Sequence, residues 1–561
     1  MSNAVDRFLA QYYARRPVNA TFTGVHAYDA ELPDWSATGL SRLDGEMRAS
    51  LADLREHHPA VPVAGGPSRG AAATSAADLD AELACGFLEI QLAENASEHG
   101  VRRNPALWTG EAIFSVVALM IRDFAPLDDR VGAATARLDT IPAFLYDAGA
   151  TIGERPIPGA WSEKARRDIH GAIALFERGI DRWLASAPHT RHKATFLKAA
   201  ATRALGAFER FDEWLVSRPV ADEATLACGT ELYDLLLARG HFCPRTRAEL
   251  LADAKQQLGT AKMALHEMAR SAAGSWDAVQ EALAADHPPA SDYLDSFGRI
   301  WNECRARVVE QDAVTWPEWP IRYTEIPEWT REAAPSLYYL YYRSPAPFDA
   351  YTTYDYVVPP LPANPAQHLG AWNHSVIKLN HVVHHGAVGH HVQNWHACHQ
   401  ARSRVGQVAA VDCANRIGMF LAGTMAEGWA CYATELMDEL GFLNRRERVS
   451  EQHSRVRFLA RAVVDIEMHQ GSMTFGGAVR FYESEVGMPA AVARAEAVKN
   501  SMFPGTAITY WLGSQGILDL RATMQQRHGI DFSLRRFHDD LLGWGSIPVP
   551  VVARLMLEGA P

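Results

Sequence analysis

The sequence has no run of apolar residues long enough to form a membrane-spanning helix, which takes about 20 residues. Its first residues, MSNAVDRFLAQYYARRPVNA, contain no apolar stretch of the kind that a secretory signal peptide carries. We therefore expect neither export nor a membrane partner, and we expect a cytoplasmic protein.

Cysteine is scarce, with seven among 561 residues, spread along the chain without a Cys-x-x-Cys pair. An odd number of scattered cysteines argues against a disulfide framework and against a zinc site built from cysteine alone. The pattern is typical of a reducing compartment, which fits the expected cytoplasmic location.

Positive charge is also limited. The 54 lysines and arginines are outnumbered by 66 aspartates and glutamates, which gives a formal net charge of -12. A chain of this charge with no basic run is not expected to bind nucleic acid. The expected partner is a small-molecule or short-peptide substrate, and the sequence leaves the oligomeric state open.

What remains is ordinary globular composition, with 48% hydrophobic and 21% charged residues, which is enough apolar material for a large core. Apolar residues recur at spacings of three and four over residues 136–152, 194–215 and 249–274, and this periodicity predicts amphipathic helices. Gly274, the last residue of the third stretch, is typical of a helix end.

Strand signals are concentrated in the middle of the chain. Residues 319–329 and 337–360 are aromatic, β-branched and interrupted by proline, which predicts short strands. We predict a mainly α fold with many helices and one small β element. The change of pattern divides the chain into an N-terminal helical region, residues 1–310, and a second region, residues 311–561, which holds the β element and further helices.

Seven of the 23 histidines stand in one segment of 19 residues, His381 to His399, HVVHHGAVGHHVQNWHACH. A metal site needs two or three ligands from nearby backbone and often a more distant carboxylate. The density of imidazoles favours such a site. Acid–base catalysis without a metal and purely structural roles are the two alternatives.

The spacing of the histidines gives two candidate ligand pairs. His381 and His385 are four residues apart and would share one face of a regular helix. His384 and His390 are six apart, which is a rotation of about 600° on a regular helix, so their rings would point in different directions. The two glycines between them permit a widened or broken turn that could bring the rings together. Spacing alone does not choose between the pairs.

A carboxylate follows in the stretch TMAEGWACYATEL, residues 424–436, which predicts a helix. Glu427 stands 43 residues after His384 and could return to the histidines from an adjacent helix. Two histidines and one glutamate form a known zinc ligand set that leaves a fourth position for water. Taken alone, a glutamate before Gly-Trp is more typical of a solvated surface than of a ligand.

Together these segments resemble the bacterial family called domain of unknown function 885, whose members are similar to zincin-type metallopeptidases. The family pattern H-E-x-x-P-G-H-H-x-Q corresponds to residues 384–393, HHGAVGHHVQ, and its pattern E-G-W-A-x-Y corresponds to residues 427–432, EGWACY. Further segments resemble family motifs in the same order: YDAELPDWS at 28–36, RLDTIPAFL at 137–145, RAVVDIEMH at 461–469 and FPGTAITYWLG at 503–513.

The resemblance implies a large multi-helix zincin-like metallopeptidase fold in which the metal-binding helix follows the small β element. It implies that His384, His390 and Glu427 bind the metal, and that the metal is zinc. This assignment selects the pair of histidines that the glycines separate.

The resemblance also gives roles to four other residues. His391 and His381 would lie behind the ligands or near the substrate. Tyr510 and His469 become candidates to bind substrate or to stabilise an oxyanion, since such sites need donors where negative charge develops. Packing in the core is the alternative for both.

The sequence departs from the family pattern at the expected general base. The glutamate that would take a proton from water is His385 here, the motif proline is Val388, and the glutamine of P-G-Q-A is Thr506. His385 could serve as a base, since the ordinary pKa of an imidazole is about 6.5. It could instead become an additional ligand, which would favour iron, manganese or cobalt over zinc, or it could mark the loss of hydrolysis.

Three functions follow from these readings. The first is a metal-dependent hydrolase of a peptide, amide or related small-molecule bond, with His385 in place of glutamate as a catalytic residue. The second is a non-peptidase metalloenzyme of specialised metabolism with lyase, cyclase or oxidative chemistry. The third is a catalytically inactive binding protein, which the retention of both histidines and Glu427 disfavours.

A basic stretch follows the Glu427 helix. We expect most of its arginines to be solvated or ion-paired, while one could anchor a substrate carboxylate. The stretch contains Arg445, Arg446, Arg448, Arg455, Arg457 and Arg461.

Overall fold

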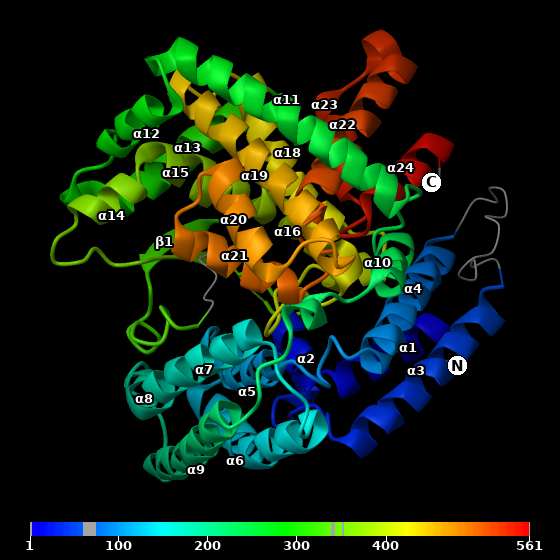
Figure 1. Cartoon of the computed structure of the whole chain (residues 1–561), viewed down its shortest axis with the longest axis vertical. Coiled ribbons are helices and arrows are strands. Elements are labelled where there is room, and N and C mark those ends of the chain that lie inside the picture. The colour runs from blue at the N-terminus through cyan, green and yellow to red at the C-terminus, as the bar shows by residue number, and fades with distance from the viewer. Residues whose placement is uncertain (1–2, 60–74, 338–342, 351–352, 560–561) are drawn as a thin grey trace.

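The computed structural model of the chain describes residues 3–59, 75–337, 343–350 and 353–559. Helices make up most of the described residues (Figure 1), which confirms the predicted mainly α fold. The N-terminal helices are α1 (Ala4–Arg15), α2 (Pro17–Thr23), α3 (Ala37–His57), α4 (Ala76–Ala96), α5 (Pro105–Met120), α6 (Leu127–Ile152), α7 (Gly159–Ala174), α8 (Ile180–Leu184), α9 (Arg191–Val216), α10 (Thr230–Leu235), α11 (Arg247–Ala273), α12 (Trp276–Ala285) and α13 (Tyr293–Glu310).

The second half of the chain is helical as well. Its elements are α14 (Ala366–Ala371), α15 (His374–Val376), the π-helix η6 (Ile377–Gly386), α16 (His390–Gln400), α17 (Arg404–Val408), α18 (Gly423–Glu439), α19 (Arg445–His469), α20 (Phe475–Val486), α21 (Ala490–Met502), α22 (Thr509–His528), α23 (Leu534–Leu542) and α24 (Val549–Glu558). Shorter helical turns are η1 (His26–Tyr28), η2 (Leu175–Gly179), η3 (Glu223–Leu226), η4 (Leu236–Gly240), η5 (Ala290–Asp292), η7 (Phe420–Ala422) and η8 (Gly529–Asp531).

The three helices predicted from periodicity are confirmed as α6, α9 and α11. Helix α11 illustrates why its boundaries lie where they do. The Thr246 hydroxyl accepts a hydrogen bond from the backbone N–H of Glu249, and the Glu249 carboxylate accepts one from the N–H of Thr246. At the other end the chain leaves the helix at Gly274 with a φ of 92°, which glycine tolerates without a steric penalty.

The predicted β element is a two-stranded sheet. Strand β1 (Ile321–Glu325) pairs in parallel with β2 (Tyr354–Val358), with Ile321 opposite Tyr354. Residues 338–342 and 351–352 of the aromatic-rich stretch lie outside the described residues. Helix α13 packs against both β1 and η6, so the sheet lies beside the segment that carries the histidines.

Two large clusters of buried apolar side chains form the core. One packs α5, α6, α7 and α9 together and joins α11 to α19; it contains Trp161 and Val463. The other surrounds η6, α16 and α18 and contains Phe8, Val383 and Trp429. Both clusters therefore draw residues from each side of residue 310. In Figure 1, α18 and α19 lie in the middle of the molecule, with α11 alongside α19.

The described helices include none that is both long enough and apolar enough to span a membrane.

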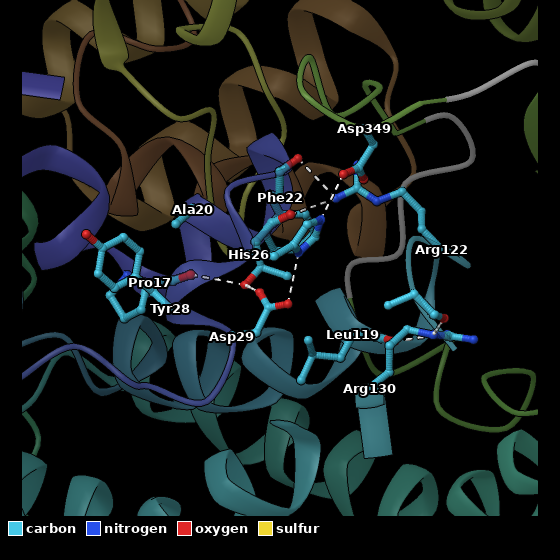
Figure 2. A network of polar contacts seen from close by, with 12 residues as sticks. Pro17, Ala20, Phe22, His26, Tyr28, Asp29, Leu119, Arg122, Arg130 and Asp349 are labelled. Atoms are coloured by element: carbon cyan, nitrogen blue, oxygen red, sulfur yellow. Dashed lines mark hydrogen bonds and ion pairs between the residues drawn. The ribbon is translucent and has the colours of Figure 1, made fainter. Parts of the chain in front are cut away.

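An ionic contact joins the first turns of the chain to the segment before β2 (Figure 2). His26 on η1 lies between two carboxylates, with Nδ1 2.9 Å from Asp29 Oδ2 and Nε2 2.8 Å from Asp349 Oδ1. Its ring stacks on Phe124 with centroids 3.8 Å apart. Burial lowers the pKa of His26, but the hydrogen bonds with Asp29 and Asp349 outweigh it and raise the pKa to about 9.

This contact predicts a pH-dependent stability. The pKa of His26 is higher in the folded chain than the ordinary value of about 6.5. Its contribution to the free energy of unfolding is therefore complete below about pH 6.5 and is lost as the pH rises through about 9. The melting temperature of His26→Gln should fall below that of the wild type at about pH 6, and the gap should narrow as the pH rises from about 6.5 to about 9. His189→Gln, at an exposed histidine, is the control. A gap that stays constant across this range would contradict the assignment.

Candidate metal centre

The histidine-rich segment begins as a π-helix. Element η6 covers ten residues, from Ile377 to Gly386, and carries His381, His384 and His385. A π-helix closes its hydrogen bonds over five residues, so its turns are wider than those of an α-helix, and such segments are frequent at functional sites. The His385 side chain also bonds five residues back along the chain: its Nδ1–H donates to the carbonyl oxygen of Asn380 at 2.6 Å.

The chain breaks between η6 and α16, and glycine is required where it does so. A Cβ placed on Gly389 would lie 1.9 Å from the carbonyl oxygen of His384, well inside any permitted contact. The backbone N–H of Gly389 donates to the carbonyl oxygen of Val383 at 2.8 Å, which closes the turn. Only a residue without a side chain lets these two stretches of backbone approach so closely.

The break is held by a side chain of the neighbouring helix. The indole N–H of Trp429, on α18, donates to the carbonyl oxygens of Val388 and Gly389 at 2.9 and 3.1 Å. Trp429 is fully buried, and the Gly389 carbonyl also accepts the backbone N–H of Gln393 at 3.1 Å, which starts α16. Since Trp429 stands two residues after Glu427, the helix that carries the carboxylate also supports the histidine turn.

The structure brings together the three side chains that the family resemblance assigns to the metal. The rings of His384 and His390 have centroids 4.9 Å apart. Glu427 Oε2 lies 3.6 Å from His384 Nε2 and 3.7 Å from His390 Nε2. The Glu427 side chain is 27% exposed, so the cluster is open to solvent.

His385 lies in the same cluster. One nitrogen from each of His384, His385 and His390 falls within 4.8 Å of the other two. Because Nδ1 of His385 donates to the Asn380 carbonyl, its lone pair is on Nε2. The residue that replaces the family's glutamate therefore has a ring nitrogen available for a proton or a cation.

His390 is oriented by a chain of hydrogen bonds. Its Nδ1 lies 3.3 Å from the side-chain oxygen of Gln393, and the Gln393 amide N–H donates to Ser546 Oγ at 2.5 Å. This arrangement fixes the proton on Nδ1 and leaves Nε2 facing Glu427. Metal-binding histidines are commonly held in this way through the nitrogen that does not bind the ion.

Tyr510 holds the carboxylate from the other side. Helices α18 and α22 approach closely because Gly428 has no side chain. A Cβ at this position would lie only 2.5 Å from the backbone of Gly513. This contact places the Tyr510 hydroxyl where it donates to Glu427 Oε1 at 3.1 Å, while Oε2 faces the histidines. Tyr510, a predicted substrate-binding residue, therefore positions a predicted ligand.

The charges of the cluster suit a cation. Burial lowers the pKa of His384 and the pKa of His385 below their ordinary values. Burial raises the pKa of Glu427, but its interaction with His384 and the charge of His390 outweigh this effect and hold the pKa well below the ordinary value. Neutral rings at His384 and His385 beside an ionised Glu427 are protonation states that suit metal binding.

His469 lies elsewhere, in the core. It is fully buried, its Nε2–H donates to the carbonyl oxygen of Asn500 at 2.9 Å, and its Nδ1 accepts from the N–H of Cys228 at 3.4 Å. Burial lowers its pKa to about 3. Both ring nitrogens are occupied by backbone, so the position of His469 does not fit the predicted contact with substrate.

His381 and His391 connect the histidine segment to the β element. The Nδ1 of His381 is hydrogen-bonded to the hydroxyl of Tyr356 on β2 at 2.7 Å, and the His391 Nε2–H donates to the carbonyl oxygen of Trp319 at 2.8 Å. Both are buried. They support the turn from behind and are not part of the cluster.

Three residues that support the site were not singled out from the sequence. Trp429 and Gln393 are defined positions of the two motifs, but no role was predicted for either. Asp465 is an acid in the apolar run VVDI; it accepts hydrogen bonds from the N–H groups of Gly505 and Ile508, which fixes the loop that leads into α22. An acidic residue inside an apolar helix face is the signal that could have identified it.

The donor set fits a divalent metal ion. Four donors at about 2 Å from a shared ion in a tetrahedron lie about 3.3 Å from one another. The separations of 3.6 and 3.7 Å between the carboxylate oxygen and the two ring nitrogens are close to that value. Imidazole nitrogen and carboxylate oxygen are both ordinary ligands of zinc.

The fold and this cluster define a mainly helical chain with a histidine–carboxylate centre at the break between two helices. Residues 17–556 match the family described as bacterial protein of unknown function (DUF885), so the chain belongs to that family, as the motifs predicted. No curated protein matches the chain.

Two solved structures resemble the fold over almost the entire chain. One is a protein from Shewanella oneidensis called a lipoprotein of unknown function, with 20% identity, 99% of each chain covered and a TM-score of 0.75. The other is a protein from Colwellia psychrerythraea called a lipoprotein, with 15% identity, 100% of each chain covered and a TM-score of 0.76. At these identities the likeness establishes the fold alone.

The break predicts a local requirement for glycine. Gly389→Ala should lower the free energy of unfolding by about 2 kcal/mol or more, because the added methyl group collides with the His384 carbonyl oxygen. Gly132→Ala, on α6 with open space around it, should change stability by no more than about 1 kcal/mol. Chemical denaturation measures both, and equal effects of the two substitutions would contradict the close approach.

Proposed function

We propose that the protein is a zinc-dependent hydrolase of a peptide, amide or related small-molecule bond, with His384, His390 and Glu427 as the metal ligands. The convergence of two Nε2 atoms on one carboxylate oxygen within 3.7 Å carries this proposal. It is supported by the order of the ligands, with two histidines around a helix break and a glutamate on the next helix, which resembles a zincin. A bound divalent ion would supply Lewis acidity to the reacting carbonyl and to water.

The residues around the ligands have separate tasks in this proposal. His385 takes the place of the family's glutamate as general base, because its Nε2 carries the free lone pair beside the cluster. The hydrogen bond that the Nδ1–H donates to the Asn380 carbonyl oxygen fixes that tautomer. Tyr510 keeps the Glu427 carboxylate turned toward the histidines and limits its rotation.

A second candidate rests on the same position of His385. Its nitrogen lies within 4.8 Å of those of His384 and His390, so it could serve as a further ligand instead of a base. Three histidines and a glutamate would complete a tetrahedral set and favour iron, manganese or cobalt. This candidate is a non-peptidase metalloenzyme with lyase, cyclase or oxidative chemistry.

The ligand assignment predicts metal content. Wild-type protein should hold one zinc ion per chain, and Glu427→Gln should weaken zinc binding about 100-fold or more, because removal of a residue that only supports a ligand already costs 10- to 100-fold. Glu435→Gln is a matched control two turns further along α18, where the carboxylate pairs with Arg455 instead. Competition with a chromogenic chelator measures the affinities. Unchanged zinc binding in Glu427→Gln would refute the assignment.

His385 separates the two candidates. If it is a base, His385→Ala should leave the absorption spectrum of the cobalt-substituted protein unchanged and lower hydrolysis of a short-peptide library about 100-fold or more, and His385→Glu should restore it. His399→Ala, at an exposed histidine of the same segment, should have no effect. A changed cobalt spectrum with weaker metal binding in His385→Ala would favour the second candidate.

A further inference from the structure

The arginines of α19 differ in whether they have partners. Four of them bond to other groups: Arg445 to Ser271, Arg448 to Asp438, Arg455 to Glu435 and Arg461 to Glu496. Arg446 is exposed to solvent. Arg457 is only partly exposed, and it forms neither a hydrogen bond nor an ion pair with any residue that the structure describes.

This unpaired state is costly for a guanidinium group. Arginine carries five N–H donors and a charge that it keeps at any physiological pH. The Nε of Arg457 is buried without an acceptor, so part of its hydration has been removed and not replaced. Burial and the charge of Arg461 both lower the pKa of Arg457. Such a group is satisfied when a carboxylate binds to it with two parallel hydrogen bonds.

Two aromatic rings connect Arg457 to the candidate metal centre. Its guanidinium carbon is 5.6 Å from the centre of the Phe458 ring, and Phe458 stacks on Tyr510 with centroids 5.4 Å apart. Tyr510 in turn donates its hydroxyl to Glu427. One turn along the same face of α19, Arg461 lies 4.6 Å from the centre of the Tyr510 ring.

A further contact agrees with this position. Cys431, one turn after Glu427 on α18, packs in one buried group with Phe458 and Tyr510. Arg461 already donates two hydrogen bonds to the Glu496 carboxylate. It therefore has fewer N–H donors left for a ligand than Arg457 has.

We propose that Arg457 binds a carboxylate of the substrate, and that the centre acts on peptides or amides in which a free carboxylate lies close to the bond that is cleaved. This inference rests on the proposed metal-dependent function. It adds the substrate class, because an unpaired arginine at the edge of the centre selects for a negatively charged group on the substrate.

The test compares ligands that differ only in that charge. The zinc-loaded protein is titrated calorimetrically with the monohydroxamates of malonic, succinic and glutaric acids, and with uncharged acyl hydroxamates of matching length. The hydroxamate group binds the metal in each, and the second carboxylate is the variable. At one or more lengths the carboxylate should tighten binding about tenfold or more, as a charge-assisted hydrogen bond does.

Variants locate the effect. Arg457→Gln should bind the charged hydroxamates no more tightly than the uncharged ones. It should still bind the uncharged hydroxamates with wild-type affinity, and this binding shows that its metal centre is intact. Arg457→Lys should keep part of the preference, and Arg446→Gln should keep all of it. Equal binding of charged and uncharged ligands by the wild type at every length, or a preference that survives in Arg457→Gln, would overturn the inference alone. Failure of the wild type to bind any hydroxamate would overturn it together with the proposed function.

Discussion

Two hydrogen bonds from one indole hold the arrangement on which the candidate centre depends. The Trp429 N–H binds the carbonyls of Val388 and Gly389 where the chain leaves η6 and before it enters α16. A continuous helix would turn His384 and His390 away from each other. The break instead brings the two rings together. It is possible because Gly389, which has no side chain, lets its backbone approach that of His384. The motif residues Gly389, Glu427 and Trp429 therefore act as one unit.

The carboxylate is positioned by a second contact between helices. Gly428 and Gly513 let α18 and α22 approach until the Tyr510 hydroxyl reaches Glu427. The start of α22 is itself fixed by Asp465, which accepts hydrogen bonds from the loop before it. Several motifs that are far apart in the sequence thus converge on the orientation of one carboxyl group, and this explains why the chain carries them in one fixed order.

Much of the fold could be read from the sequence, because amphipathic periodicity and capping residues are local signals. The helices α6, α9 and α11 and the small sheet followed from such patterns. The ligand pair could not be derived from spacing, because a regular helix was the only geometry that spacing could test. The break that follows η6 depends on Trp429, which stands 41 residues after Val388 and 40 after Gly389, and on close backbone contacts that no local rule describes.

The roles of single residues were harder to predict than the position of the site. His469 and Tyr510 both stood in motifs, but one bonds to backbone in the core and the other to Glu427. Arg457 was one of six arginines in a basic stretch, and what distinguishes it is a buried Nε without a hydrogen-bond partner among the described residues. That property belongs to the folded chain, since it depends on where the acidic residues of other helices come to lie.

The central claim is that imidazole and carboxylate groups from three helical segments bind one cation. X-ray absorption spectroscopy at the zinc edge of the zinc-loaded protein tests it most directly. The account predicts a first shell of nitrogen and oxygen at about 2.0–2.1 Å, with the outer-shell scattering of at least two imidazole rings. A shell that contains sulfur at about 2.3 Å, or one of oxygen alone without imidazole scattering, would contradict it.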